Sequence, residues 1–301
     1  MTAPLHFLGL PDRLSDAPRM AIFGAGHGTT YAGRDSSGHA LAPDAIRAAS
    51  RDDAGLIDHW DFDLGGPLFN GKPVCCVDLG NVDTVMHENE ANRARIEAKV
   101  REVLASGAVP IMLGGDDSTV IPFVSGFADH GPIFIVQIDA HIDWRDELAG
   151  ERFGYSSPMR RASEMAHVNG MLQVGLRGVG SARIEEIEAA QNFGSRFITA
   201  REIHSKGINE ALRHVPAGAN VLVTLDCDGL DPSIMPGVAA RSPGGLTYTE
   251  VTELIAGLGK RAGIVGFDLV ELYPPADLSG LSALTASRIL VNAIGTIVRN
   301  T

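Results

Sequence analysis

The chain alternates between short apolar runs, which predict strands, and segments with helical periodicity. We expect strands at 20–23, 73–80, 109–113, 132–136, 171–175, 196–199, 220–225 and 263–268. No linker, repeat or low-complexity tract interrupts this alternation. It therefore predicts a single domain over residues 1–301, of the α/β class, built as a three-layer α-β-α sandwich with a mostly parallel central sheet of about eight strands.

Helices are expected between these strands. They begin near Ala42 and Ser157, and they span 88–106, 118–128, 182–192, 208–214, 247–260 and 281–298. Gly107 follows the 88–106 segment, at the position where a glycine commonly ends a helix. We expect the polar stretch 145–157 and the Gly- and Pro-rich stretch 229–245 to be loops, and the first of them to border an active site.

Two carboxylates and an imidazole follow the apolar run 132–136. In an extended segment side chains alternate between faces, so Asp139, His141 and Asp143 are expected to project to one side. Like charges grouped at a buried strand end repel each other and lose their solvation, which is costly unless something compensates them. A divalent cation would provide that compensation.

Two further acidic clusters lie at strand ends. Asp226 and Asp228 follow the apolar run 221–225, and Asp116 and Asp117 follow a strand and a Gly-Gly turn. In open α/β sheets, sites form in the crevice at the carboxyl ends of the strands, so we expect the three clusters to meet there. The repetition disfavours the simpler interpretation, which is a set of solvated polar loops.

Composition and charge narrow the classes of function. The formal net charge is −12, and no basic stretch has interleaved aromatic residues, so no nucleic-acid partner is expected. No apolar run approaches the roughly 20 residues that span a bilayer, so no membrane partner is expected either. Cys75, Cys76 and Cys227 are odd in number and form no Cys-x-x-Cys pair. This pattern argues against a disulfide framework or a zinc ribbon and favours the cytoplasm.

Several motifs together resemble those of the arginase/agmatinase (ureohydrolase) family, and of its agmatinase-like bacterial branch in particular. Residues 139–143 are similar to the Asp-Ala-His-x-Asp signature of that family, and 226–232 to its Asp-x-Asp-x-x-Asp-Pro signature. Residues 114–118 resemble its Gly-Gly-Asp-His-Ser, 267–271 its late Asp-x-Val-Glu, and 236–246 its long loop. The motifs appear in the order of the family along most of the chain.

The resemblance implies a dinuclear centre with two Mn²⁺ per chain. The implied ligands are five carboxylates and one imidazole, namely Asp117, Asp139, His141, Asp143, Asp226 and Asp228. Asp139 and Asp226 would bridge the two ions. Asp117 and Asp143 would complete the coordination of one ion. His141 and Asp228 would complete the coordination of the other. Oxygen-rich ligation with one imidazole suits Mn²⁺.

The resemblance also implies an activity, the hydrolysis of an agmatine-like guanidino compound to urea and an amine. This is the class of hydrolases that act on C–N bonds in linear amidines. A hydroxide that bridges the two metal ions would attack the guanidinium carbon. Asp143, beside the bridging water, would accept the proton of that water and pass it to the leaving nitrogen. Glu271 would hold the guanidinium through paired, charge-assisted hydrogen bonds. The expected partner is a small cationic or zwitterionic guanidino substrate.

Two residues depart from the family pattern. Asp117 replaces the histidine of Gly-Gly-Asp-His-Ser, and the added negative charge is expected to raise the pKa of a metal-bound water, so an alkaline optimum or Ni²⁺ becomes plausible. Tyr155 replaces the histidine of a His-Gly-x-Pro segment that lies near the leaving amine in the family. Tyr155 can donate a hydrogen bond, but its reference pKa of about 10 makes it a poor proton shuttle at neutral pH.

Two alternatives remain open at this point. The chain is either a hydrolase of another linear C–N bond, such as a formimino or amide bond, or a weakly active metal-binding subunit of a mixed oligomer. Glu271 argues against a neutral amide, because a carboxylate would not help to bind it. The retained metal carboxylates argue against an idle subunit, because an idle site has no physical reason to keep so much repulsion.

The residue that binds the far end of the substrate is expected in or beside the loops 145–158 and 232–245, or near His27. Basic candidates there are Arg145, Arg152, Arg160 and Arg241. The family resemblance further implies a homo-oligomer, either a trimer or a hexamer.

Overall fold

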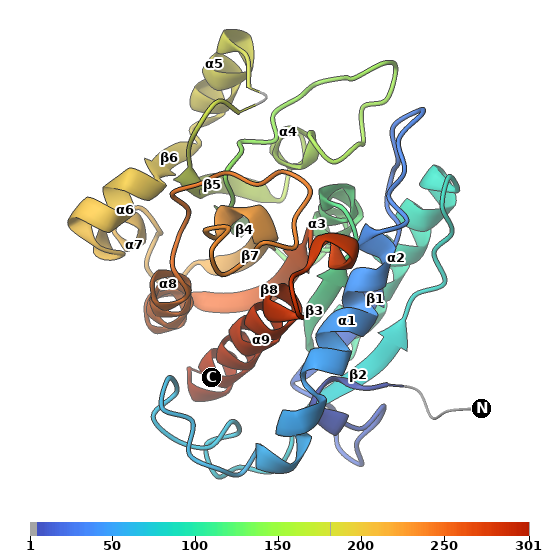
Figure 1. The fold of residues 1–301 in the computed structure, drawn as a ribbon, viewed down its shortest axis with the longest axis vertical. Coiled ribbons are helices and arrows are strands. Elements are labelled where there is room, and N and C mark those ends of the chain that lie inside the picture. Colours follow the sequence, from blue (N-terminus) through green and yellow to red (C-terminus); the bar gives the residue numbers. More distant parts are fainter. Residues whose placement is uncertain (1–4, 181, 301) are drawn as a thin grey trace.

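The computed structural model describes residues 5–180 and 182–300, and one eight-stranded sheet runs through its centre (Figure 1). The strands are β1 (Met20–Ala25), β2 (Cys76–Asn81), β3 (Val109–Gly114), β4 (Ile133–Ile138), β5 (Val168–Leu176), β6 (Arg196–Thr199), β7 (Asn220–Asp226) and β8 (Gly263–Val270). Every pairing is parallel, and the order across the sheet is β2-β1-β3-β8-β7-β4-β5-β6. The expected parallel sheet of about eight strands is confirmed.

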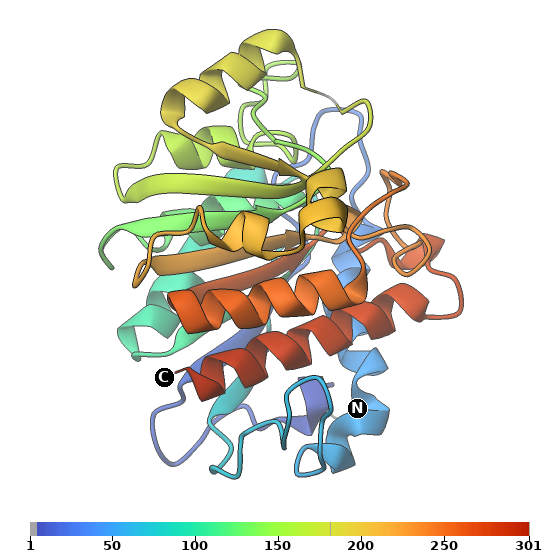
Figure 2. The ribbon, with the colours of Figure 1, turned by 90° about the vertical axis from the view of Figure 1, so that its left-hand side faces the viewer.

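Helices cover both faces of the sheet, and each layer has its own buried apolar cluster. One layer contains α1 (Ala42–Ala49), α6 (Ala200–Lys206), α7 (Asn209–Leu212), α8 (Tyr248–Arg261) and α9 (Leu281–Arg299). The other contains α2 (Asn89–Ala105), α3 (Val120–Ser125), α4 (Pro158–Ser163) and α5 (Ile184–Phe193). Figure 2 shows α8 and α9 lying side by side along one face. The three-layer α-β-α architecture is therefore confirmed.

Local sequence signals explain several helix boundaries. Gly107 adopts a positive φ of 81° just after α2, as expected for a glycine that ends a helix. Two differences were found. The helix expected at 118–128 is shorter, with a 3₁₀ turn before α3. Helix α6 was not predicted, although a capping box between Thr199 and Glu202 marks its start.

Helix α9 is long and apolar enough to cross a membrane by length and composition alone, with 83% of the relevant window buried inside the fold. The expectation that no segment approaches this length was therefore wrong. The apolar surface of α9 packs against α1 and α8, so its place in the core accounts for its composition.

The four central strands position the candidate chemistry. β3, β8, β7 and β4 are adjacent in the sheet, and each ends beside an acidic residue: Asp116, Glu271, Asp226 and Asp139. Because all the strands are parallel, their carboxyl ends meet at one edge of the sheet, which is where α/β proteins form their sites.

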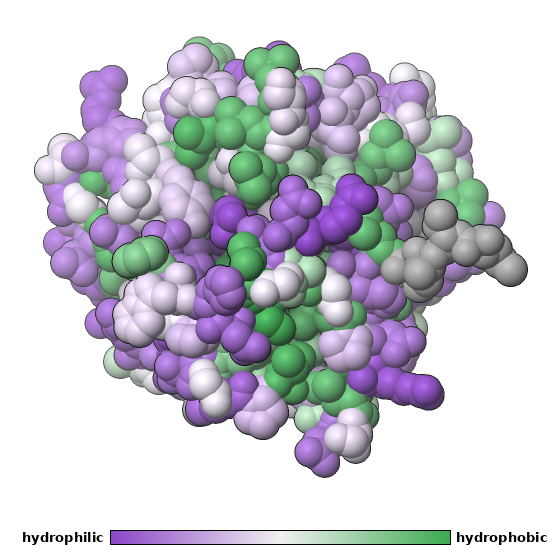
Figure 3. Space-filling model, turned by 60° about the horizontal axis from the view of Figure 1, so that its bottom comes forward, coloured by the Kyte–Doolittle hydropathy of each residue, from purple (hydrophilic) through white to green (hydrophobic). Residues whose placement is uncertain are grey.

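The exposed side chains include both polar and large apolar ones. Figure 3 shows polar side chains over much of one face, with apolar ones gathered toward its lower middle. The most exposed large apolar residues include Phe62, at 90%, and Trp60, at 63%, both in the segment between α1 and β2. Cys75 is half-buried, Cys76 and Cys227 are buried, and all three are free thiols.

Candidate metal centre and substrate cavity

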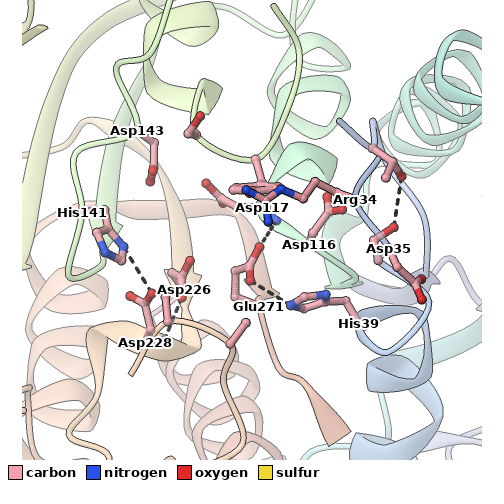
Figure 4. A pocket seen from close by; sticks show the side chains of 16 residues that line it. Arg34, Asp35, His39, Asp116, Asp117, His141, Asp143, Asp226, Asp228 and Glu271 are labelled. Atoms are coloured by element: carbon pink, nitrogen blue, oxygen red, sulfur yellow. Dashed lines mark hydrogen bonds and ion pairs between the residues drawn. The ribbon is translucent and has the colours of Figure 1, made fainter. Parts of the chain in front are cut away.

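A cavity of about 400 Å³ lies at the carboxyl ends of the four central strands (Figure 4). Acidic side chains dominate its wall. The lining residues include Asp116, Asp117, Asp143, Asp226, Asp228 and Glu271, together with His39, His141, Tyr155 and Arg34. The structure thus brings the three sequence clusters together, as expected.

Five of the six predicted ligands line this cavity, and the sixth, Asp139, is fully buried beside them. Two groups of side chains have ligand atoms that all lie within 4.8 Å of one another. The first is Asp117, Asp139 and Asp143, and the second is Asp139, His141 and Asp228. Asp139 belongs to both groups, and its bridging of two ions stays a prediction. Asp226 lines the cavity beside them but belongs to neither group, so its bridging role stays a prediction.

The backbone around these ligands differs from the expected extended strands. Strand β4 ends at Ile138, and Asp143 has a left-handed backbone conformation with φ of 48°. Residues Cys227–Gly229 form a 3₁₀ turn in which the side chain of Asp226 accepts a 2.7 Å hydrogen bond from Asp228 N. Simple alternation of faces was therefore the wrong reason for the clustering. Tight turns after β4 and β7 direct the side chains to one place.

A buried amide joins two of the carboxylates. Gln137 lies in the apolar strand β4, and its Nε2 donates hydrogen bonds to Asp139 Oδ2 (2.6 Å) and Asp143 Oδ2 (2.7 Å). Gln173 in turn donates to Gln137 Oε1 at 2.5 Å and so fixes the amide. Gln137 was not predicted from the sequence as part of the site. A polar residue inside an apolar strand was the available signal, because such a side chain is buried only with partners.

The electrostatics of the cluster favour a bound cation. Burial raises the pKa of Asp117, Asp139 and Asp226 well above the usual range, and the charges of neighbouring carboxylates raise it further. The hydrogen bond to Asp228 raises the pKa of His141 to about 10. Buried carboxylates that oppose one another's ionisation are the groups that a divalent cation stabilises in their charged form.

In Figure 4, Glu271 lies between Asp226 and His39, below Asp117. It follows β8 with a left-handed φ of 62°, and its Oε1 accepts a 2.8 Å hydrogen bond from the backbone N–H of Asp117. Its Oε2 lies 3.0 Å from His39 Nε2. A carboxylate therefore faces the cavity next to the candidate metal ligands, as predicted.

Tyr155 also lines the cavity, half-buried, with its ring edge-on to Tyr31 at a centroid distance of 4.8 Å. Burial raises the pKa of the Tyr155 hydroxyl, although the charge of Arg34 opposes this shift. Tyr155 is thus placed to donate a hydrogen bond, and a raised pKa makes it a weaker proton donor. Its role in the reaction stays a prediction.

The basic residues expected to bind the far end of a substrate do not line the cavity. Arg152 and Arg160 contact Asp146 and Glu164. Arg145 pairs with Glu186, and Arg241 donates to backbone carbonyls, including that of Pro236. These arginines therefore hold the loops in place.

Two basic residues that were not predicted from the sequence line the cavity, Arg34 and His39. Both lie in the segment before α1, which carries none of the motifs discussed above. Among residues 5–180 and 182–300, the Arg34 side chain has no hydrogen-bond or ion-pair partner, and Figure 4 shows it reaching over the cavity. Only the position of this loop beside the strand ends reveals these residues.

Comparisons with known proteins agree with this geometry. The model of the Arginase family matches residues 18–295. The chain is 31% identical to a mitochondrial guanidino acid hydrolase of Homo sapiens over 71% of the chain and 62% of the human protein, and 31% identical to a mitochondrial agmatinase of Gallus gallus over 84% and 74%. It therefore spans less than two thirds of the human relative.

Among solved structures, the proclavaminate amidino hydrolase of Streptomyces clavuligerus superimposes with a TM-score of 0.86. The match covers 100% of the chain and 99% of that protein, at 26% sequence identity. The similarity thus extends over the whole sheet and both helical layers.

Proposed function

Since the chain belongs to the arginase family, we propose that it is a metal-dependent hydrolase that releases urea and an amine from a guanidino compound. The observation that carries this proposal is the shared cavity. Members of both sets of candidate metal ligands and the carboxylate of Glu271 line one space of about 400 Å³. That combination suits a small cation held next to a metal centre.

The donor set fits two divalent cations. Asp139 would be shared by both ions, Asp117 and Asp143 would bind one, and His141 and Asp228 the other, with Asp226 beside them. Asp117 Oδ2 is buried and has no hydrogen-bond partner among the described residues, as expected for an atom that binds an ion. We propose Mn²⁺, with Ni²⁺ as the alternative, because the donors are carboxylates and one imidazole. When bound, such a pair of ions would acidify a shared water to hydroxide near neutral pH.

Glu271 would bind the guanidinium group. A carboxylate and a guanidinium form paired, charge-assisted hydrogen bonds in one plane. The hydrogen bond from Asp117 N fixes the Glu271 carboxylate beside the ligand cluster. This arrangement would hold the guanidinium carbon over the metal ligands, and it disfavours a neutral amide as the substrate.

Asp143 would accept the proton of the attacking water and pass it to the leaving nitrogen. Its carboxylate lines the cavity, is 7% exposed and is held by Gln137. A buried carboxylate with a raised pKa accepts a proton more readily than an exposed one, and burial raises the pKa of Asp143. Tyr155 would donate a hydrogen bond on the opposite wall.

The unpaired Arg34 favours a substrate with a carboxylate at its far end. Arg34 is an exposed cation of the cavity wall, and the adjacent Asp35 already accepts a hydrogen bond from Ser37 N. A guanidino acid would place its guanidinium at Glu271 and its carboxylate at Arg34. Agmatine would place an ammonium near Arg34, where the two charges repel each other.

We further propose that the protein acts in the cytoplasm as a homo-oligomer, a trimer or a hexamer. The three free cysteines suit a reducing compartment. The exposed Trp60 and Phe62 are the kind of side chains that a subunit contact covers.

The test is urea release after loading with Mn²⁺ or Ni²⁺, from agmatine, 4-guanidinobutyrate, 3-guanidinopropionate, arginine and guanidine. We expect urea from a guanidino acid, lost in Asp228→Ala and kept in Asp129→Ala, a surface aspartate that pairs with Arg101. Bound metal without urea from any of them would redirect the proposal to a formimino or amide bond, or to a weakly active subunit. A preparation that binds no metal would refute it.

A further inference from the structure

A buried histidine contacts the carboxylate that faces the substrate. His39 is 8% exposed, and its Nε2 lies 3.0 Å from Glu271 Oε2. The two residues lie far apart in the sequence, and the fold brings the loop before α1 against the end of β8 (Figure 4). The catalytic scheme above does not use His39.

The surroundings fix the orientation of the His39 ring. The ring packs on Tyr273, with 4.9 Å between the centroids. Gly38 allows this contact, because a Cβ there would lie 2.0 Å from the Tyr273 ring. Tyr273 is itself held by a 2.7 Å hydrogen bond from its backbone N–H to Gly237 O. The His39 ring is therefore packed between the ring of Tyr273 and the carboxylate of Glu271.

The two oxygens of Glu271 thus have different partners. Asp117 N donates to Oε1, and His39 contacts Oε2. Each carboxylate oxygen has two lone pairs, so each can still accept a hydrogen bond from a ligand in the cavity. With both oxygens held, the carboxylate plane is fixed before a substrate arrives, and a fixed plane is what a paired guanidinium contact requires.

We propose that His39 is a positioning residue for substrate binding, which holds Glu271 in the plane that receives the guanidinium group. The proposal rests on the proposed function, in which Glu271 binds the substrate. It adds a residue from outside the motifs of the sequence to the recognition of the guanidinium. It also couples binding to the protonation of an imidazole.

The coupling follows from the charges around His39. The groups that face it are Glu271, Asp116 and Asp35, all acidic, and the neutral ring of Tyr273. Burial lowers the pKa of His39, but the close contact with the charged Glu271 and the charges of both aspartates outweigh it, so the pKa is raised overall. A guanidinium that binds Glu271 repels the imidazolium, so substrate binding is expected to release a proton.

The test compares His39→Leu, which removes the contact, with His39→Gln, which keeps an N–H donor without a titratable charge. His204→Leu is the matched control, because His204 forms a similar pair with Glu250 (2.9 Å) on the surface, away from the cavity. For each metal-loaded variant, kcat and KM for urea release are measured across the neutral pH range. Binding of guanidinium chloride is measured by calorimetry in two buffers of different ionisation enthalpy, which gives the number of protons released.

We expect His39→Leu to raise KM roughly 10- to 100-fold with a smaller change in kcat, because a buried ion-pair contact that holds the Glu271 carboxylate is lost. His39→Gln should recover most of the affinity and lose both the proton release and the pH dependence of KM. His204→Leu should match the wild type. An unchanged KM and proton count in His39→Leu would overturn the proposal.

Absence of urea release and absence of a positioning role for His39 can be told apart, because the calorimetric experiment does not depend on turnover. If the wild type releases no urea, calorimetry still decides the role of His39. Weaker guanidinium binding in His39→Leu than in wild type, at equal metal content and melting temperature, supports the positioning role. Equal binding, or no guanidinium binding by the wild type, overturns it.

Discussion

The backbone N–H of Asp117 donates a 2.8 Å hydrogen bond to Oε1 of Glu271. One residue is a candidate metal ligand and the other the candidate guanidinium receptor, so a single turn after β3 connects the two halves of the site. A change in the backbone at this turn would move the ligand and the receptor together. The position of the metal ligand therefore depends on the position of the guanidinium receptor, and the reverse also holds.

The buried amide of Gln137 should control metal affinity. Gln137→Leu removes the donor shared by Asp139 and Asp143 and leaves two carboxylates close together without it. Loss of a group that orients metal ligands typically weakens metal binding roughly 10- to 100-fold. Competition with a metal-sensitive dye would measure the change. Gln191→Leu, on the exposed side of α5, should bind metal like the wild type, and unaltered affinity in Gln137→Leu would show that the amide is not needed.

Asp117→His should shift the pH profile of urea release to lower pH. The substitution replaces an anionic ligand by a neutral imidazole, and a site with less negative charge favours deprotonation of a bound water. We expect the acidic limb of the pH profile of kcat to shift by about one pH unit. A shift of that size requires only a modest change in the electrostatic energy of the metal-bound water. Metal content should be measured in parallel. A profile that coincides with that of wild type would argue that Asp117 does not bind the ion.

Arg34→Leu should change which substrate the enzyme prefers. If Arg34 binds a carboxylate, KM for 4-guanidinobutyrate should rise about 10-fold or more, the loss expected for a hydrogen bond between charged groups. KM for agmatine should stay the same or fall. Arg152→Leu is the control, because Arg152 pairs with Asp146 outside the cavity wall. An equal effect on both substrates would mean that Arg34 does not distinguish their tails.

The loop that follows β7 should lose stability in acid because of Asp231. The side chain accepts hydrogen bonds from the backbone N–H groups of Ser233, Gly244 and Gly245. Burial opposes ionisation, but these hydrogen bonds lower the pKa of Asp231 to about 2.

The folded-state pKa of Asp231 is below its unfolded value. Its stabilisation is therefore fully present above about pH 4 and is lost as the pH falls toward about 2. Because Asp231 is partly exposed, we expect it to contribute only about 1 kcal/mol. Asp231→Asn should lower the free energy of unfolding at neutral pH by that amount and flatten the acid dependence. Urea denaturation at a series of pH values measures both, and identical acid slopes in the two proteins would contradict this account.

The sequence was enough to predict the sheet, its parallel strands and the side chains that meet at its edge. Those predictions depend on local patterns, such as apolar runs that end in Asp139 or Asp226. It was not enough for the backbone at Asp143, whose left-handed conformation depends on packing around the turn. It also missed His39 and Arg34, because their contacts are made only when the loop before α1 reaches the ends of distant strands.

The order of the strands also affects how the site is assembled during synthesis. β3 and β4 follow each other in the chain, yet β8 and β7 lie between them in the sheet. Until both late strands have left the ribosome, the inner edges of β3 and β4 have no native neighbour. The ligands carried by Asp117 and Asp139 therefore stay apart until nearly the whole chain is made. Metal binding would then be among the last events of folding. Chains truncated before β8 should expose two unpaired sheet edges, which chaperones can bind.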